Sequence, residues 1–339
     1  MLRKRLTAQL LAGPPAVDPV AVADRLLAVQ AQDPRGFKLA VRARTTGLSA
    51  ADVDRALTED RSLVVTWLNR GTLHLVRAED YAWLHALTAP PNLRATLRRL
   101  GQLGVDEAEA DRGVAVIERR LADEGPLTRK QLGERLARAD VATAGQALIV
   151  LLALVCLRGV AVRGPVAEGD QAYVLVRDWM GELEEVDREI ALGELARRYL
   201  RGHGPAGERD LARWAGLPLR DARAGLAAIA SELEQRDDGL VELTGRPRAA
   251  ELPPPRLLGA FDPLLLGWTS RELVVGEHRS AITVNGIFRP FALVRGRAAA
   301  TWRMPGGKVV LEPLRPLSRA VTAALRKEAD DVVRFLDTT

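Results

Sequence analysis

Residues 62–81 read SLVVTWLNRGTLHLVRAEDY, and this stretch decides the fold class. Two runs rich in β-branched and apolar residues, 62–68 and 72–77, flank a short turn at 69–71 that contains a glycine. Two such runs separated by a short glycine-containing loop are typical of a β-hairpin. We therefore predict a hairpin over this stretch.

Helix patterns precede the hairpin. Apolar residues recur at helical spacing over 18–31 and again over 51–59. Asp18 followed by Pro19 supplies an N-cap and a proline for the first turn of the first helix. Helices followed by a hairpin give the outline of a winged helix, a common DNA-binding motif.

The same order of elements returns twice farther along the chain. GPLTRKQLGERL at 125–136 leads into an apolar helix pattern at 143–157 and then to two more β-rich runs. GPAGERDLARWAGL at 204–217 leads to a helix pattern and a short strand. Both segments begin with Gly-Pro and a polar entry, so we interpret them as equivalent helices of two further repeats.

The composition changes in the last quarter of the chain. LPPPR at 252–256 predicts a rigid linker or edge, and short β-rich runs follow it, among them LVVG at 273–276. Asn285-Gly286 and Gly306-Gly307 are typical of hairpin turns. A last helix is predicted over 316–336, so the chain should end in a small β-rich domain with a terminal helix.

The composition favours a globular protein of two or three domains, with 339 residues of which 47% are hydrophobic. The formal net charge of +5 is compatible with phosphate contacts but does not by itself select DNA as a ligand. The longest apolar run, 147–157, is too short to span a bilayer, and the beginning of the chain is a poor signal peptide. We expect a cytoplasmic protein with no membrane partner, in which Cys156 is a core residue.

Several kinds of chemistry are disfavoured by motifs that the sequence lacks. It contains no glycine-rich phosphate loop, no HExxH, no paired-cysteine zinc pattern and no GxSxG elbow. Four histidines are spread along the chain without the spacing of metal ligands: His74, His85, His203 and His278. We therefore expect neither a metal site nor a cofactor.

Three polar residues stand out within apolar or β-rich stretches. His74 alternates with leucines in the hairpin and is interpreted as a surface or interface residue. Asp262 precedes Pro263, where an Asx-turn is the favoured interpretation. Arg289 follows the Asn285-Gly286 turn, and could either contact a phosphate or brace the β-rich domain.

VQAQDPRG at 29–36 closes the first predicted helix with two glutamines, Gln30 and Gln32. Residues two apart on a helix point in different directions, so both cannot face the core. A glutamine amide donates and accepts hydrogen bonds but is no useful base near neutral pH. It suits the hydrolysis of an N-alkylated purine, whose cationic base leaves readily once a water is positioned. On spacing alone, an ordinary helix end that meets water is the favoured interpretation.

Four segments together resemble one known family: VQAQDPRG, TWLNRGTLHLV, GAFDPLLLGW and NGIFRPFALVRGRAAATWRM. They resemble the bacterial winged-helix DNA glycosylases of the AlkZ and YcaQ type, and the similarity covers nearly the whole chain. With the repeats above, the resemblance implies an α+β fold of three tandem winged-helix motifs followed by a small C-terminal β-barrel with a terminal helix. The expected boundaries are 1–105, 106–187 and 188–250 for the winged helices, and 251–339 for the barrel.

The resemblance implies that Gln30 and Gln32 are catalytic. Gln30, Ala31 and Gln32 match the Gln-apolar-Gln motif of the AlkZ-like branch, whose glutamines would orient the attacking water at C1′. The resemblance also points to residues of the first hairpin as neighbours of the site or of DNA: Arg70, Thr72 and His74.

Other candidates near the site or on DNA are Asp33, Asp262 and Arg289. Asp33 could serve as a carboxylate near the site, but because it precedes Pro34 we interpret it as the end of the helix. Lys38 raises the alternative of a lyase that acts through a Schiff base. We favour the lyase less, because hydrolysis by water needs no lysine.

The leading hypothesis is a monofunctional DNA glycosylase that removes N-alkylated purines, among them N7-alkylguanine, bulky adducts and interstrand crosslinks. Its partner would be double-stranded DNA containing such lesions, bound in an open cleft by a monomer associated with the nucleoid. One alternative is a non-catalytic winged-helix DNA-binding regulator, because a fold does not fix a function. Another is a module whose wings contact protein. The sequence does not decide between general repair and protection against a toxic metabolite.

Overall fold

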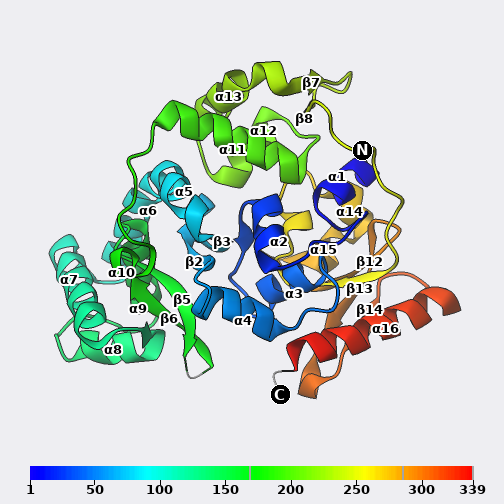
Figure 1. The fold of residues 1–339 in the computed structure, drawn as a ribbon. Helices are drawn as coiled ribbons and strands as arrows, with labels where there is room; N and C mark the ends of the chain where they lie inside the picture. Colours follow the sequence, from blue (N-terminus) through cyan, green and yellow to red (C-terminus); the bar gives the residue numbers. More distant parts are fainter. Residues whose placement is uncertain (168, 285, 338–339) are drawn as a thin grey trace. The chain divides into compact units, whose positions relative to one another are not determined.

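The structure is a computed structural model and describes residues 1–167, 169–284 and 286–337. The chain forms two compact units, which are described one at a time (Figure 1). The terminal unit comprises residues 1–53, 192–214 and 218–339, and the central unit comprises residues 54–191 and 215–217. The first and last parts of the chain therefore belong to the same unit.

The terminal unit begins with short elements. They are α1 (Leu2–Ala8), α2 (Pro19–Leu26), β1 (Val29–Gln30) and α3 (Gly36–Arg42). The Asp18 carboxylate accepts a hydrogen bond of 2.6 Å from the Ala21 N–H, and Pro19 occupies the first turn of α2. The predicted start of this helix is thereby confirmed.

The end of the first helix differs from the prediction. The helix stops at Leu26 instead of continuing to residue 31, because Leu27 has a φ of 65°, where a right-handed helix cannot continue. The chain then enters β1, so Gln30 lies on a strand and Gln32 lies in the loop behind it. The prediction that the two glutamines close a helix was wrong.

The predicted third repeat has the expected order of elements. Its helices and strands are α11 (Arg188–His203), α12 (Glu208–Ala215), α13 (Leu219–Ala228), β7 (Leu233–Gln235) and β8 (Val241–Leu243). β7 and β8 pair antiparallel, so a hairpin stands where the sequence predicted one short strand. On the buried side of α11, Tyr199 stacks on His203 with ring centroids 4.8 Å apart, and Trp268 lies edge-on to His203.

The last part of the terminal unit contains a four-stranded antiparallel sheet in the order β14-β13-β12-β9. Its strands are β9 (Arg256–Leu258), β12 (Phe291–Val294), β13 (Arg297–Arg303) and β14 (Val310–Pro313). Gly306 and Gly307 have positive φ in the turn between β13 and β14, which confirms that predicted turn. The terminal helix is confirmed as α16 (Arg319–Leu336), drawn in red in Figure 1, whose buried residues include Leu325 and Phe335.

The predicted closed barrel was wrong. Among the described residues the sheet is open, with β14 and β9 at its two edges, whereas a barrel requires the edge strands to pair with each other. β10 (Thr283–Val284) and β11 (Ile287–Phe288) form a separate hairpin and do not extend the sheet. The LVVG run became part of the helix α14 (Glu272–Val275) instead of a strand. Asn285 of the predicted turn lies outside the described residues.

The central unit contains the predicted hairpin of residues 62–81. β2 (Leu63–Leu68) and β3 (Thr72–Arg77) pair antiparallel from Leu63 opposite Arg77 to Leu68 opposite Thr72, which confirms the first hairpin. A second hairpin is formed by β5 (Ala161–Ala167) and β6 (Asp170–Leu175). Val65 of β2 pairs with Arg163 of β5, so both hairpins belong to one sheet in the order β3-β2-β5-β6, with β4 (Leu127–Thr128) beside β6.

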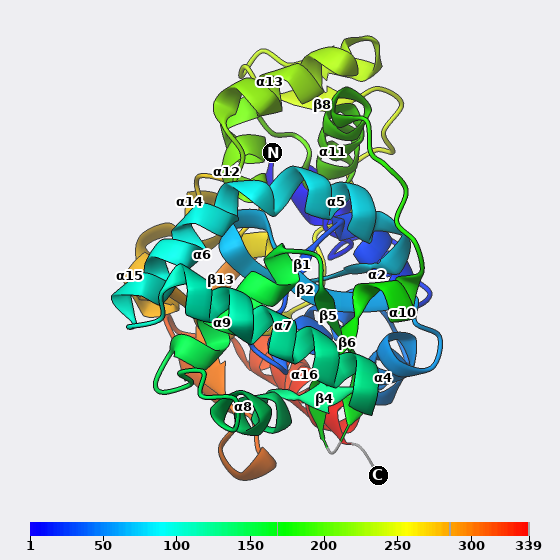
Figure 2. The ribbon, with the colours of Figure 1, turned by 90° about the vertical axis from the view of Figure 1, so that its left-hand side faces the viewer.

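Helices pack together beside this sheet. They are α5 (Tyr81–Thr88), α6 (Pro90–Gln102), α7 (Glu107–Glu124), α8 (Arg129–Ala137) and α9 (Ala147–Leu157). Figure 2 shows α6, α7 and α9 side by side, and α9 is apolar all round, as expected of a buried helix. Cys156 of α9 is fully buried, which confirms its prediction as a core residue. In the part of the chain that the structure describes, no helix is long and apolar enough to cross a membrane.

Candidate active site

The side chains of Gln30 and Gln32 meet. Gln30 lies on β1 and Gln32 in the bend that follows, and this non-helical path of the chain brings together two amides that a helix would have separated. Gln30 Nε2 donates a hydrogen bond to Gln32 Oε1. Gln30 is only 6% exposed, whereas Gln32 is exposed, so the pair leads from the interior of the protein to its surface.

Asp33 fixes the loop that follows the glutamines. Its Oδ1 accepts hydrogen bonds from the Arg35 N–H at 3.0 Å and from the Gly36 N–H at 2.6 Å. These bonds form the turn into α3. The prediction that Asp33 ends a helix was wrong, because the residue instead prepares the beginning of the next one.

Gly36 allows close packing at the start of α3. A Cβ atom at this position would lie 2.5 Å from the Ala260 carbonyl oxygen, which is far inside normal contact distance. Gly259 is also closely packed, since its own Cβ would lie 3.0 Å from the Gly36 carbonyl oxygen. The segment GAFD at 259–262 therefore packs directly against the start of α3, next to the glutamine loop.

Asp262 is fully buried and paired with Arg44, which is also fully buried. Two hydrogen bonds of 2.9 Å join the Arg44 guanidinium to the two oxygens of the Asp262 carboxylate. Asp262 Oδ1 also accepts from the Leu264 N–H at 2.9 Å, which confirms the predicted Asx-turn. A direct contact of Asp262 with DNA is excluded by this burial, so its place in the site is that of a support.

The remaining candidates of the terminal unit are Lys38 and Arg289. Lys38 lies half-buried on α3, two residues after Gly36. Arg289 is exposed directly behind β11, and its backbone N–H donates to the Ile282 carbonyl at 2.9 Å. Its side chain is therefore available to solvent, as a phosphate contact would require.

In the central unit the first hairpin brings together Arg70, Thr72 and His74. Arg70 has a φ of 52° at the tip of the hairpin. His74 is 2% exposed, so of the two interpretations, surface or interface residue, the surface one was wrong: residues on both faces of β3 are buried. Burial, with a smaller effect of the Arg70 charge, lowers the pKa of His74 to about 3. The imidazole is therefore neutral near pH 7 and can only act as a hydrogen-bonding group.

Asn69 is a candidate that the sequence reasoning missed. It is fully buried beside Arg70, and neither its Oδ1 nor its Nδ2 has a hydrogen-bond partner among the described residues. Buried amides usually have hydrogen-bond partners, so a buried amide without one in the protein is a candidate for contact with a ligand. The only signal in the sequence was an asparagine in a hairpin turn, which is too common to single out.

Potential metal ligands do not gather at either group of candidates. Among residues 1–167, 169–284 and 286–337, no three His, Cys, Asp or Glu side chains are grouped in a way that could hold a metal ion. The polar groups at the glutamine site are two amides, a carboxylate held by backbone N–H groups, and the exposed Arg35.

A comparison with protein families identifies the class of protein. A family model described as DNA glycosylase AlkZ-like matches residues 23–335, which is most of the chain. The chain belongs to the AlkZ-like family of DNA glycosylases. The matched AlkZ-like region includes the paired glutamines, the first hairpin and the C-terminal sheet. Membership of the AlkZ-like family confirms the predicted enzyme class and the resemblance noted in the sequence.

Two AlkZ-like relatives come from Streptomyces sahachiroi. An interstrand DNA cross-link repair glycosylase is 30% identical over 341 residues, which cover 92% of this chain and 89% of that protein. The solved structure of Streptomyces sahachiroi DNA glycosylase AlkZ matches with a TM-score of 0.77 and 26% identity, covering 98% of this chain and 95% of that one. The AlkZ-like fold is thus shared over nearly the whole length of the chain.

Proposed function

We propose that the protein is a monofunctional DNA glycosylase that hydrolyses the N-glycosidic bond of N-alkylated purines, such as N7-alkylguanine, in double-stranded DNA. The observation that supports the proposal is the hydrogen bond between the amides of Gln30 and Gln32 where the interior meets the surface. An amide cannot remove a proton from water near neutral pH. The pair therefore suits a substrate whose leaving group is already activated by a positive charge.

The chemistry follows from that charge. Alkylation at N7 or N3 makes the purine cationic, so the bond between C1′ and the base breaks with both electrons going to the base. The water oxygen then bonds to C1′, and its proton passes to solvent. The protein has to hold the water near C1′ and face the developing positive charge of the sugar with an oxygen, which are tasks of positioning and electrostatics.

The geometry supports different roles for the two glutamines. A carbonyl oxygen has two lone pairs, so Gln32 Oε1 can accept from Gln30 Nε2 and from the attacking water together. The buried Gln30 fixes the direction of this carbonyl, and the exposed Gln32 contacts the water. Asp33 acts through the backbone by holding the loop, rather than as a base.

The remaining candidates are assigned to binding and support. Contacts with the DNA are made by Arg70, Thr72 and Arg289. His74 supplies a neutral hydrogen bond. Asp262 is buried and supports the segment that packs against the glutamine loop. The protein acts as a monomer built from three winged helices and uses no Schiff base. Because one Streptomyces sahachiroi relative is named for interstrand cross-link repair, the proposed substrates include bulky adducts and crosslinks.

The experiment is a single-turnover assay of base release from a duplex that contains 7-methylguanine. Replacing both glutamines, Gln30→Ala with Gln32→Ala, should abolish release while the melting temperature stays close to that of the wild type. Gln102→Ala is the matched control, because Gln102 is exposed at the end of α6 in the central unit. Release that survives the double substitution would overturn the assignment of the catalytic residues.

A further inference from the structure

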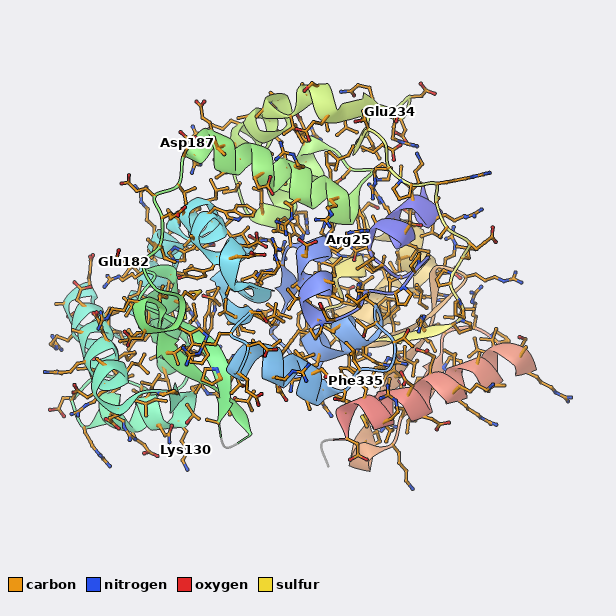
Figure 3. The ribbon with its side chains drawn as sticks, viewed as in Figure 1. Arg25, Lys130, Glu182, Asp187, Glu234 and Phe335 are labelled. Carbon is orange, nitrogen blue, oxygen red and sulfur yellow. The ribbon has the colours of Figure 1, made fainter. Side chains whose placement is uncertain are left out.

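A basic cleft of about 560 Å³ opens in the terminal unit. It is bordered by α1, the ends of α2 and α11, the hairpin β7–β8 and residues 244–249. Its basic side chains are Lys4, Arg25, Arg201, Arg246 and Arg248. Figure 3 labels Arg25 at the end of α2 and Glu234, one of the cleft's two acidic residues, on β7.

The acidic residues do not balance this positive charge. Glu242, the second carboxylate of the cleft, is shared between Lys4 at 2.5 Å and Arg236 at 3.2 Å. Arg201 pairs with Asp24, which lies outside the cleft lining, at 2.8 Å. The five basic and two acidic side chains that line the cleft leave an excess of three positive charges.

Among residues 1–167, 169–284 and 286–337, no carboxylate forms an ion pair with Arg25 or Arg246. The Arg25 Nε is buried and has no hydrogen-bond partner among the described residues. Arg246 donates to two backbone carbonyls at the end of α11, those of Leu200 at 3.1 Å and Arg201 at 3.2 Å. Guanidinium groups in such surroundings retain most of their capacity to bind an anion.

The positive charges of the arginines also repel one another. Burial, and after it the Arg201 charge, lowers the pKa of Arg25. Burial lowers the pKa of Arg246 as well, and the Arg25 charge adds to this effect while Glu242 opposes it. An anion placed between these side chains would relieve the repulsion that they exert on one another.

Two glycines allow close packing beside Arg25 and Arg246. A Cβ at Gly202 would lie 2.3 Å from the Arg25 carbonyl oxygen, so the ends of α2 and α11 touch through this glycine. A Cβ at Gly204 would lie 2.3 Å from Arg246 Nη1, so this guanidinium lies against the backbone. The cleft is thus built into the packing of α2 against α11 and does not depend on flexible surface side chains alone.

We propose that this cleft binds a phosphate group, and that the group is a backbone phosphodiester of the DNA substrate. The planar, multiply donating guanidinium matches phosphate oxygens, and contacts with phosphates fix the position of a protein on DNA without reading its sequence. Arg25 lies five residues before Gln30 in the same unit, so a phosphate held there would help to position the strand relative to the glutamine loop. The choice of DNA as the source rests on the proposed function.

The test measures binding of undamaged duplex DNA as a function of salt concentration, for the wild type and for Arg25→Gln. Loss of one phosphate contact should raise Kd roughly three- to tenfold near 0.1 M salt and reduce the slope of log K against log salt by about 0.9. Arg25→Lys should recover most of the slope, because it restores the charge. Arg248→Gln, at an exposed residue of the cleft, repeats the test if Arg25→Gln fails to fold. The matched control is Arg326→Gln on the exposed face of α16.

A second measurement separates DNA from a free anion. The melting temperature is recorded with inorganic phosphate and with chloride at equal ionic strength. Stabilisation by phosphate that Arg25→Gln removes, with an unchanged DNA slope, would mean that the ligand is a free phosphate and would overturn the DNA source. No change in either measurement would overturn the proposal as a whole. These outcomes are independent of base release by the glutamine variants, which tests the proposed function.

Discussion

Gln30 and Gln32 differ in their exposure, so single substitutions should separate their roles. Gln32→Ala removes the oxygen proposed to hold the water, and should lower the single-turnover rate the most. Gln30→Ala leaves that oxygen but removes the N–H that orients it, and should cost roughly a hundredfold or less. Base release from 7-methylguanine DNA at saturating enzyme gives both rates. A larger loss for Gln30→Ala would reverse the two roles.

Two buried histidines make stability depend on pH. Burial lowers the pKa of both His74 and His203 to about 3, well below the ordinary 6.5. Below pH 6.5 the unfolded chain therefore binds protons that the folded chain does not, so the free energy of unfolding falls as pH falls from 6.5 toward 3. At pH 5 the loss should be roughly 2 kcal/mol for each histidine, measured by urea denaturation at pH 7 and pH 5.

His203→Phe is the variant that checks this prediction. The phenyl ring keeps the aromatic stack on Tyr199 but cannot take up a proton. The variant should therefore lose less stability than the wild type between pH 7 and pH 5, whatever its stability at pH 7. An equal loss in both proteins would show that His203 does not contribute to the pH dependence.

At the level of single residues, the sequence predicted some candidates and missed others for physical reasons. Gln30 and Gln32 were found because they belong to a family motif, although the local structure predicted for them, the end of a helix, was wrong. The burial of Asp262 against Arg44 could not be predicted, because it depends on a contact between residues far apart in the chain. Arg25 was missed because one arginine carries no signal in a chain so rich in basic residues.

The junction between the glutamine loop and α3 depends on Gly36. Gly36→Ala would place a Cβ 2.5 Å from the Ala260 carbonyl oxygen, so the start of α3 or the segment 259–262 must move. We expect a loss of about 1–3 kcal/mol of stability, together with a lower rate of base release because the glutamines lie on the same loop. Urea denaturation and the single-turnover assay measure the two effects.

Gly101→Ala is the matched control for this change. Gly101 lies within α6, and a Cβ there would meet no atom within 4 Å. Alanine favours a helix more than glycine does, so this variant should be more stable by about 0.5–1 kcal/mol and should keep its activity. A Gly36→Ala protein as stable and active as Gly101→Ala would contradict the proposed packing role.

Elements with strong local signals were predicted well, and elements decided by packing were not. The Asp18-Pro19 start of α2, the first hairpin and the terminal helix each have a local cause, and each is confirmed. The end of α2 depends on the positive φ of Leu27, which no property of leucine indicates. A four-residue apolar run such as 273–276 fits a strand and a short helix equally well, and here it is helical.

The arrangement of the whole chain was only partly accessible from the sequence. The order of helices and hairpins was predicted, but the pairing of β2 with β5, which joins two hairpins in one sheet, was not. The terminal unit is also interrupted by the central unit in the sequence. Both features depend on contacts between distant residues, so the division into three winged helices stays a prediction.

At the scale of the whole molecule, the openness of the site should determine how large a lesion the protein accepts. An enzyme that encloses its base in a deep pocket must extrude that base from the duplex, and a base tethered to the opposite strand cannot be extruded in this way. Gln32 is exposed, which suits an open site where water reaches C1′ without complete enclosure of the base. We therefore expect cleavage at an N7-linked interstrand crosslink as well as at 7-methylguanine. On a denaturing gel, cleavage of the crosslink is read as separation of the two strands, and release of 7-methylguanine is read as strand scission after cleavage of the abasic site. The Gln30→Ala, Gln32→Ala protein should leave both substrates intact. Release of 7-methylguanine with an intact crosslink would instead show that the base must leave the duplex before the glutamines can act.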